Sequence, residues 1–109
     1  MSKKWSESER LRLQELIEEA TIDCYDEEEQ LSGFWTMIEE NVVCPFQAKV
    51  IGEEVTVTGF EWPSGRNFLA VCERNGKKYQ VDLTSLEWTK PRPEGFEWIE
   101  AYFLWLEEF

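Results

Sequence analysis

The spacing of apolar residues changes twice along the chain, and this change constrains the fold more than any other feature. Before Pro45 the apolar residues recur at helical spacing, and from Phe46 they alternate with polar residues as in a β-strand. After Pro93 the spacing is helical again. A chain of 109 residues is the size of one domain. We therefore expect a single α+β domain over residues 1–109, with helices before and after a set of strands.

The first helix is predicted from a capping signature and the apolar pattern behind it. Ser6 is followed three residues later by Glu9, so that each side chain can accept a hydrogen bond from the other's backbone N–H. This pair predicts a helix over about residues 7–20. Its core-facing side is expected to consist of Leu13, Leu16, Ile17 and Ala20.

The second helix is predicted in the same way. Asp26 is a favourable N-cap residue and Glu29 stands three positions later, so the helix should begin there and end between residues 41 and 45. Gly33 inside it costs about 1 kcal/mol relative to alanine, which suggests that another part of the chain approaches closely. One apolar stripe is expected, formed by Leu31, Phe34, Trp35, Ile38 and Val42.

Four strands are predicted between the helical regions. Alternation marks residues 46–50 and 55–58, and two further runs, 68–73 and 78–83, flank Asn75-Gly76. That dipeptide favours a two-residue type I′ hairpin turn. Sequential strands joined by short turns indicate an antiparallel meander. The expected fold is therefore α+β, with acidic helices packed on a small twisted antiparallel sheet or SH3-like open barrel.

A third helix is predicted from Glu94 to Phe109. Its apolar residues are too many for one narrow stripe, so the helix is either heavily buried or offers a face for self-association or a protein partner. The residues concerned are Phe96, Trp98, Ile99, Tyr102, Phe103, Trp105, Leu106 and Phe109.

The charge excludes several classes of function. The formal net charge is -12, and residues 13–48 contain ten acidic residues and no lysine or arginine. Nucleic acids and anionic membranes bind through lysine and arginine, so neither is an expected partner. Cations or basic proteins are expected instead.

Cysteine and histidine usage limits the chemistry further. The chain has three widely spaced cysteines and no histidine, which argues against a disulfide scaffold, a zinc site and a cysteine nucleophile activated by histidine. We find no signal-peptide pattern and no Gly-rich phosphate loop. We expect a cytoplasmic protein that is not an enzyme.

The densest acidic segment begins the second helix. Calcium takes roughly six to eight oxygen ligands, which one short segment can supply in large part. On a helical wheel, Glu27 and Glu28 lie on either side of the apolar stripe, which predicts that their side chains are partly buried. Glu29 should point outward. The candidate calcium ligands in this segment are Asp23, Asp26, Glu27, Glu28 and Glu29.

Two other interpretations of the acidic segment stay open. Asp26 and Glu29 would serve simply as helix caps, or the acidic surface would bind a basic protein partner or imitate nucleic acid. An EF-hand loop starting at Asp23 does not fit, because Glu28 would replace its required glycine and Phe34 its bidentate glutamate. A calcium site here would be of another kind.

A second oxygen-rich cluster lies at the far end of the same helix. Glu39, Glu40 and Asn41 are about 16 Å from Glu29 along the helix, so the two clusters cannot hold the same ion. Glu40 is a candidate ligand of a separate site, and a solvated helix end is the other interpretation.

A family resemblance covers residues 23–51. It is carried by the run from Tyr25 to Gln30, by Gly33 with its aromatic neighbours, by Ile38-Glu39-Glu40-Asn41, and by Pro45-Phe46 with Ala48-Lys49-Val50. These motifs, in this order, resemble the small bacterial, cyanobacterial-type calcium-binding family typified by CcbP. The resemblance implies a non-EF-hand calcium binder that acts as an intracellular buffer or sensor. It also implies a ligand role for Asp26, Glu27, Glu28 and Glu29, with Asp23 beside them and Glu40 following more weakly.

Overall fold

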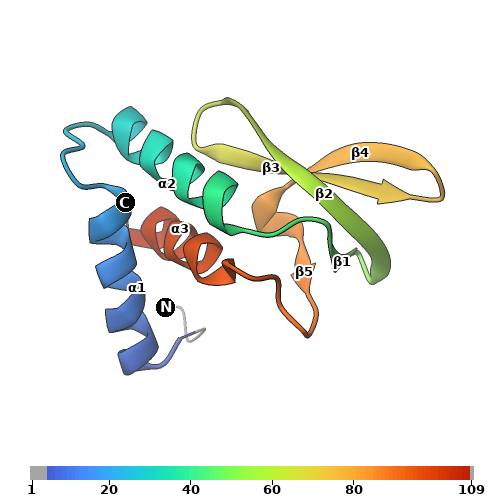
Figure 1. The fold of residues 1–109 in the computed structure, drawn as a ribbon, viewed down its shortest axis with the longest axis horizontal. Helices are drawn as coiled ribbons and strands as arrows, with labels where there is room; N and C mark the ends of the chain where they lie inside the picture. The colour runs from blue at the N-terminus through green and yellow to red at the C-terminus, as the bar shows by residue number, and fades with distance from the viewer. Residues whose placement is uncertain (1–4, 109) are drawn as a thin grey trace. The chain divides into compact units, whose positions relative to one another are not determined.

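The chain divides into two compact units in the computed structural model, which describes residues 5–108. The helical unit comprises Met1–Asn41 and Gly95–Phe109, and the sheet unit comprises Val42–Glu94 (Figure 1). The sheet unit is therefore inserted into the sequence of the helical unit. That residues 1–109 form a single domain stays a prediction.

The helical unit contains α1 (Glu7–Ala20), α2 (Glu27–Asn41) and α3 (Phe96–Glu108). The predicted start and end of α1 are confirmed. Its capping box is formed, because the Glu9 N–H donates to Ser6 Oγ and the Ser6 N–H donates to Glu9 Oε1. The last helix begins two residues later than predicted, and Phe109 lies outside the described residues.

The core of the helical unit is aromatic. Phe34 of α2 is fully buried, and its ring centroid lies 6.1 Å from that of Tyr102 and 5.5 Å from that of Trp105. The Trp105 Nε1–H donates to Gln30 Oε1 at 2.9 Å, so the buried indole has a partner for its polar atom. Burial accounts for the breadth of the apolar set on α3. A self-association or protein-partner role for this helix stays a prediction.

The sheet unit is a five-stranded antiparallel sheet in the order β4-β3-β2-β1-β5. The predicted four-stranded meander is confirmed, and a fifth strand of two residues, which we did not predict, pairs with β1. The strands are β1 (Phe46–Val50), β2 (Glu53–Ser64), β3 (Asn67–Arg74), β4 (Lys77–Asp82) and β5 (Glu87–Trp88).

Backbone geometry explains how this sheet turns and bends. Asn75 and Gly76 have φ values of 54° and 76°, the positive values that the predicted type I′ turn requires. The long strand β2 pairs with β1 through its first residues and with β3 through the rest, and its register with β3 shifts twice. Such irregularities bend a strand, as the edge of a small open barrel requires. A short 3-10 helix, Leu83–Ser85, leads to β5.

Among residues 5–108, none of the helices combines the length and the apolar character that a membrane span requires.

Candidate metal centre

The acidic segment starts from a fixed helix end. After α1, the N–H and the Oγ1–H of Thr21 both donate to the Ile17 carbonyl, at 3.0 and 2.7 Å, and the Cys24 N–H donates to the Thr21 carbonyl at 3.0 Å. Asp23, the first candidate ligand, has a positive φ of 58°, a conformation that aspartate tolerates better than most residues. A tight turn therefore presents the Asp23 side chain to solvent.

Gly33 sets how closely the two helices around this turn approach. A Cβ atom at Gly33 would lie 2.0 Å from the carbonyl oxygen of Ala20, the last residue of α1. Only glycine allows this approach without a shift of the backbone. The prediction that Gly33 marks a close contact is confirmed. The contact holds the second turn of α2 against the end of α1, and the candidate ligands from Asp23 to Glu29 lie on the chain before this contact.

Asp26 and Glu29 form the predicted cap, with one difference. The Glu29 N–H donates to Asp26 Oδ1 at 2.8 Å, as expected for an N-cap. The Glu29 side chain, however, accepts from the Tyr25 N–H at 3.2 Å and not from the N–H of Asp26. Capping thus engages Oδ1 of Asp26 and Oε1 of Glu29, one oxygen of each carboxylate.

The prediction that Glu27 and Glu28 are partly buried is wrong, because both side chains are exposed. The first buried residue of α2 is Leu31, so the packing of this helix begins one turn after the helix itself. The first turn lies beyond the packed part of α2. All five candidate ligands between residues 23 and 29 are exposed to solvent.

The structure does not gather these carboxylates around one point. Within residues 5–108, no group of three or more Asp, Glu, Cys or His side chains lies close enough to hold a metal ion. Glu40 is exposed near the other end of α2, beside Asn41, whose amide donates to the Met37 carbonyl at 2.8 Å. The donor atoms are nevertheless the oxygen type that calcium prefers, and exposed side chains can turn toward a common ion.

The pKa of the Cys24 thiol reflects the negative charge of the segment. Its thiol donates to the Glu29 carbonyl, with 3.3 Å between sulfur and oxygen. Burial raises the pKa of the Cys24 thiol, and the negative charges of Glu29, Asp23 and Asp26 raise this pKa further. The thiol therefore stays protonated at neutral pH, and the segment offers oxygen ligands and no thiolate.

Two apolar neighbours of the candidate ligands did not feature in the sequence prediction. Ile22 is 72 % exposed and Tyr25 is 87 % exposed, far more than is usual for such side chains. The sequence could have indicated this exposure, because both residues lie between the two predicted helices and outside the apolar stripe of each. They give the acidic segment an apolar component as well as charge.

Comparisons with known proteins bear on the family and the fold. The model of the family Calci_bind_CcbP, described as calcium binding, matches residues 14–106, a range that includes every candidate ligand. A comparison with curated proteins gives no match. Among solved structures, the crystal structure of Anabaena CcbP is similar in fold, with a TM-score of 0.74 at 18 % sequence identity over 97 % of this chain and 95 % of that chain. Because the family match spans most of its length, the chain belongs to the CcbP family of calcium-binding proteins.

Proposed function

We propose that the protein is an intracellular calcium buffer or sensor that captures the ion reversibly through the carboxylates of the segment from Asp23 to Glu29. The observation that carries the proposal is the calcium-binding family match over residues 14–106, which contains this densely acidic segment. Ion capture needs no catalytic group. The described residues also contain no disulfide bond, which is consistent with a reducing compartment.

The segment suits reversible capture because contacts position its backbone while its carboxylates are exposed. The turn after α1 and the contact of Gly33 with Ala20 fix the backbone, whereas the side chains of Asp23, Glu27 and Glu28 are exposed. Like charges so close together repel one another, and a bound divalent cation removes that repulsion. Side-chain reorientation is the cost of binding, and relief of repulsion offsets it.

Glu40 belongs to a second, weaker candidate site. Glu39 and Glu40 lie in the last turn of α2, which contains no basic residue. The negative end of the helix dipole disfavours acidic side chains at this position, so a cation would stabilise them. We propose that Glu40 contributes to calcium binding here, independently of the segment around Asp26.

Calorimetric titration with calcium tests the main proposal. The substitution pair Asp26→Asn and Glu28→Gln removes two candidate ligands, while asparagine still caps the helix. The matched control pair is Glu15→Gln with Glu19→Gln, two exposed acidic residues on α1 that change the net charge equally. We expect the ligand pair to weaken calcium binding by about tenfold or more, and the control pair to retain it.

Terbium luminescence locates the ion. Trp35 lies in α2, and energy transfer from its indole requires a nearby ion. Terbium emission excited through tryptophan should fall in the Asp26→Asn, Glu28→Gln protein. The proposal fails if the wild-type protein binds no calcium between micromolar and millimolar concentration, or if both substitution pairs bind equally well.

A second candidate function is recognition of a basic protein partner. The exposed side chains of Ile22 and Tyr25 among the carboxylates favour it, because an apolar contact surrounded by acidic residues suits a basic amphipathic segment. Such binding would weaken steeply with added salt. Substitution of Tyr25 by serine would reduce partner binding and leave calcium binding intact, which distinguishes the two functions.

A further inference from the structure

The sheet unit contains a groove whose origin lies in two prolines. Strand β5 pairs with β1 only through Trp88 with Ala48 and Glu87 with Lys49. Beyond this point Pro91 and Pro93 have no N–H to donate, so the chain cannot continue the ladder along β1. The segment after β5 therefore separates from β1, and residues of both line a groove of about 640 Å³.

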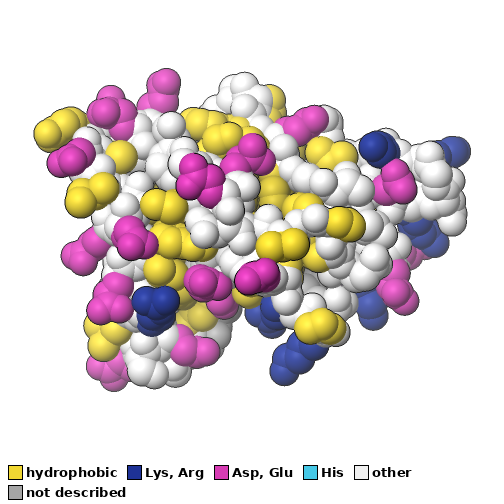
Figure 2. Space-filling model, in the orientation of Figure 1, with side chains coloured by type: hydrophobic (Ala, Val, Ile, Leu, Met, Phe, Trp, Pro, Cys, Tyr) yellow, Lys and Arg dark blue, Asp and Glu magenta, His cyan; other side chains and the backbone are white. Residues whose placement is uncertain are grey.

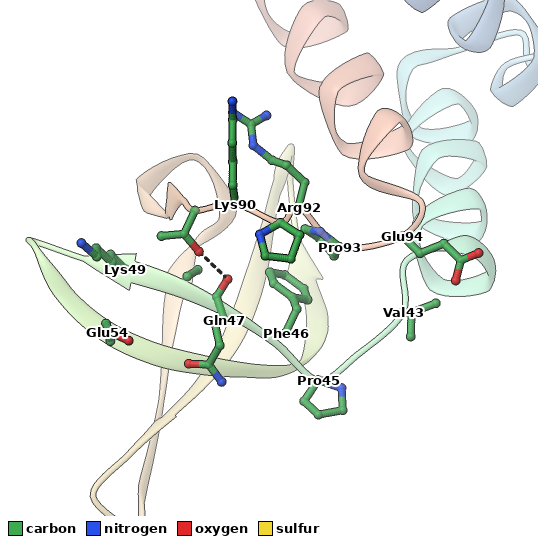
Figure 3. Close-up of a pocket in the computed structure, with 13 residues that line it drawn as sticks. Val43, Pro45, Phe46, Gln47, Lys49, Glu54, Lys90, Arg92, Pro93 and Glu94 are labelled. Carbon is green, nitrogen blue, oxygen red and sulfur yellow. Dashed lines mark hydrogen bonds between the residues drawn. The ribbon is translucent and has the colours of Figure 1, made fainter.

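Two hydrogen bonds join residues that line the groove. The Thr89 hydroxyl donates to the Gln47 carbonyl at 3.3 Å, shown as the dashed line in Figure 3. The Val43 N–H donates to the Glu94 carbonyl at 3.0 Å. The volume is within the range of roughly 300–1,000 Å³ that is typical of ligand-binding clefts. Hydrogen bonds within the sheet unit thus hold both sides of the groove.

Part of the groove surface is apolar. Phe46 is buried, and its ring is stacked on Trp88 with a centroid distance of 5.8 Å. Val43 is 52 % exposed and lines the groove, and Pro45 and Pro91 are also exposed. An occupant with small or flat apolar side chains would cover these residues.

Charge on the groove is asymmetric. Lys49, Lys90 and Arg92 line it, and in Figure 3 the side chains of Lys90 and Arg92 project from the same side of the segment after β5. Glu94 lies at the opposite end beside Val43, and Glu54 is the cross-strand neighbour of Lys49. Three cations on one groove stand out in a protein whose net charge is -12.

We propose that this groove binds an extended acidic peptide segment of a partner protein, with its apolar side chains on Phe46, Val43 and the prolines and its carboxylates beside Lys90 and Arg92. Arginine pairs with carboxylates through two parallel hydrogen bonds, and extended peptides commonly dock beside strand edges. Charge complementarity favours an acidic occupant over a basic one. The net negative charge of the protein opposes every anion, but it opposes a nucleic acid more than a short peptide, because each nucleotide has a charge and none has an apolar side chain for Val43 and the prolines.

Fluorescence anisotropy on the full chain tests this proposal. The probe is a short labelled peptide in which phenylalanine and leucine alternate with glutamate, in buffer without calcium so that the peptide itself binds no ion. Two matched peptides replace glutamate by lysine or the apolar residues by serine. We expect the acidic apolar peptide alone to bind, with affinity that falls as salt is added.

The protein variants place the peptide in the groove. Lys90→Glu with Arg92→Glu should weaken binding by about tenfold, since two favourable ion pairs become repulsive. The control, Lys77→Glu with Lys78→Glu, changes the charge equally at two exposed positions of β4. Lys90→Gln with Arg92→Gln repeats the test without new negative charge, in case the reversed pair does not fold.

Four results would overturn the proposal. The first is that the acidic apolar peptide does not bind, and the second is that the β4 control variant weakens its binding as much as the groove variants do. The third is that the lysine peptide or a single-stranded RNA binds equally well or more tightly. The fourth is that the protein self-associates in sedimentation velocity and that the Lys90 and Arg92 variants abolish this self-association. The last result would identify a second copy of this chain as the occupant. Retention of calcium binding by the groove variants would show that the two sites are separate.

Discussion

The two units of this protein differ in how they use charge. The sheet unit has seven Lys and Arg residues and seven Asp and Glu residues, whereas the helical unit has four and sixteen. In Figure 2 acidic side chains are spread over the helices, and most of the basic side chains visible in this view lie over the strands. The whole net charge of -12 therefore belongs to the helical unit.

The difference shows what each architecture tolerates. In the sheet unit, charges of opposite sign face each other across strands, as where Arg74 forms an ion pair with Glu53 at 2.5 Å. On α1 and α2 an acidic surface is tolerated because the packed stripe is narrow and the other faces are solvated. Excess negative charge on a helix pair is thus compatible with folding, and it is the charge that a calcium ion requires.

Unfolding the protein tests most directly whether the two units are independent. We expect both units to unfold in one transition, because the helical unit is interrupted in sequence by the sheet unit, whose ends meet at the Val43–Glu94 hydrogen bond. Amide NMR signals from the two units should disappear at the same urea concentration. Separate midpoints would show two independently folding domains.

The next largest effect is expected at Gly33. Gly33→Ala places a Cβ atom against the Ala20 backbone and should lower the free energy of unfolding by about 3 kcal/mol. Gly59→Ala in β2 is the matched control, since no atom lies within 4 Å of its Cβ position, and its effect should stay within about 0.5 kcal/mol. Urea unfolding measures both. Equal effects would contradict the close approach of α1 and α2.

Calcium should stabilise the protein through the helical unit. At about a hundred times its dissociation constant, the ion should raise the free energy of unfolding by about 2.7 kcal/mol. Hydrogen exchange should slow most at amides between Thr21 and Leu31, and least in the β3–β4 hairpin. Magnesium at the same concentration is the control for ionic strength, and slowing confined to the sheet would place the ion elsewhere.

The smallest predicted effect concerns the cap of α1. Ser6→Ala should cost about 1 kcal/mol at neutral pH. Hydrogen bonds from the Ser6 backbone and side chain lower the pKa of Glu9 from its ordinary value of 4.5. A lowered pKa contributes stability above pH 4.5 that is lost as the pH falls through the folded-state pKa. The difference between wild type and Ser6→Ala should therefore shrink on acidification, and a constant difference down to strongly acidic pH would contradict the capping box.

Much of this fold was predictable because local signals dominate it. Capping residues located the start of α1, and Asn75-Gly76 located the hairpin, since both depend on residues close in sequence. Strand β5 was missed because two residues are too few to show alternation. The burial of Glu27 and Glu28 was mispredicted because helical periodicity says nothing about where packing along a helix begins.

The candidate site was predictable only in part. The acidic residues and their cap follow from the sequence, whereas the orientation of exposed side chains does not, because solvent imposes no unique rotamer on them. The groove beside β1 was not predictable, because it forms where the segment after β5 returns to β1, some forty residues later in the sequence. No local pattern encodes such a long-range contact.

The interrupted order of the helical unit has a consequence for protein synthesis. As the chain leaves the ribosome, α1 and α2 appear first, then the sheet unit, and α3 last. Until α3 emerges, Phe34 lacks the rings of Tyr102 and Trp105, and Gln30 lacks the indole N–H that it accepts. A nascent chain would thus display the acidic segment before α2 is packed, and the core of the helical unit would be completed only when α3 is made.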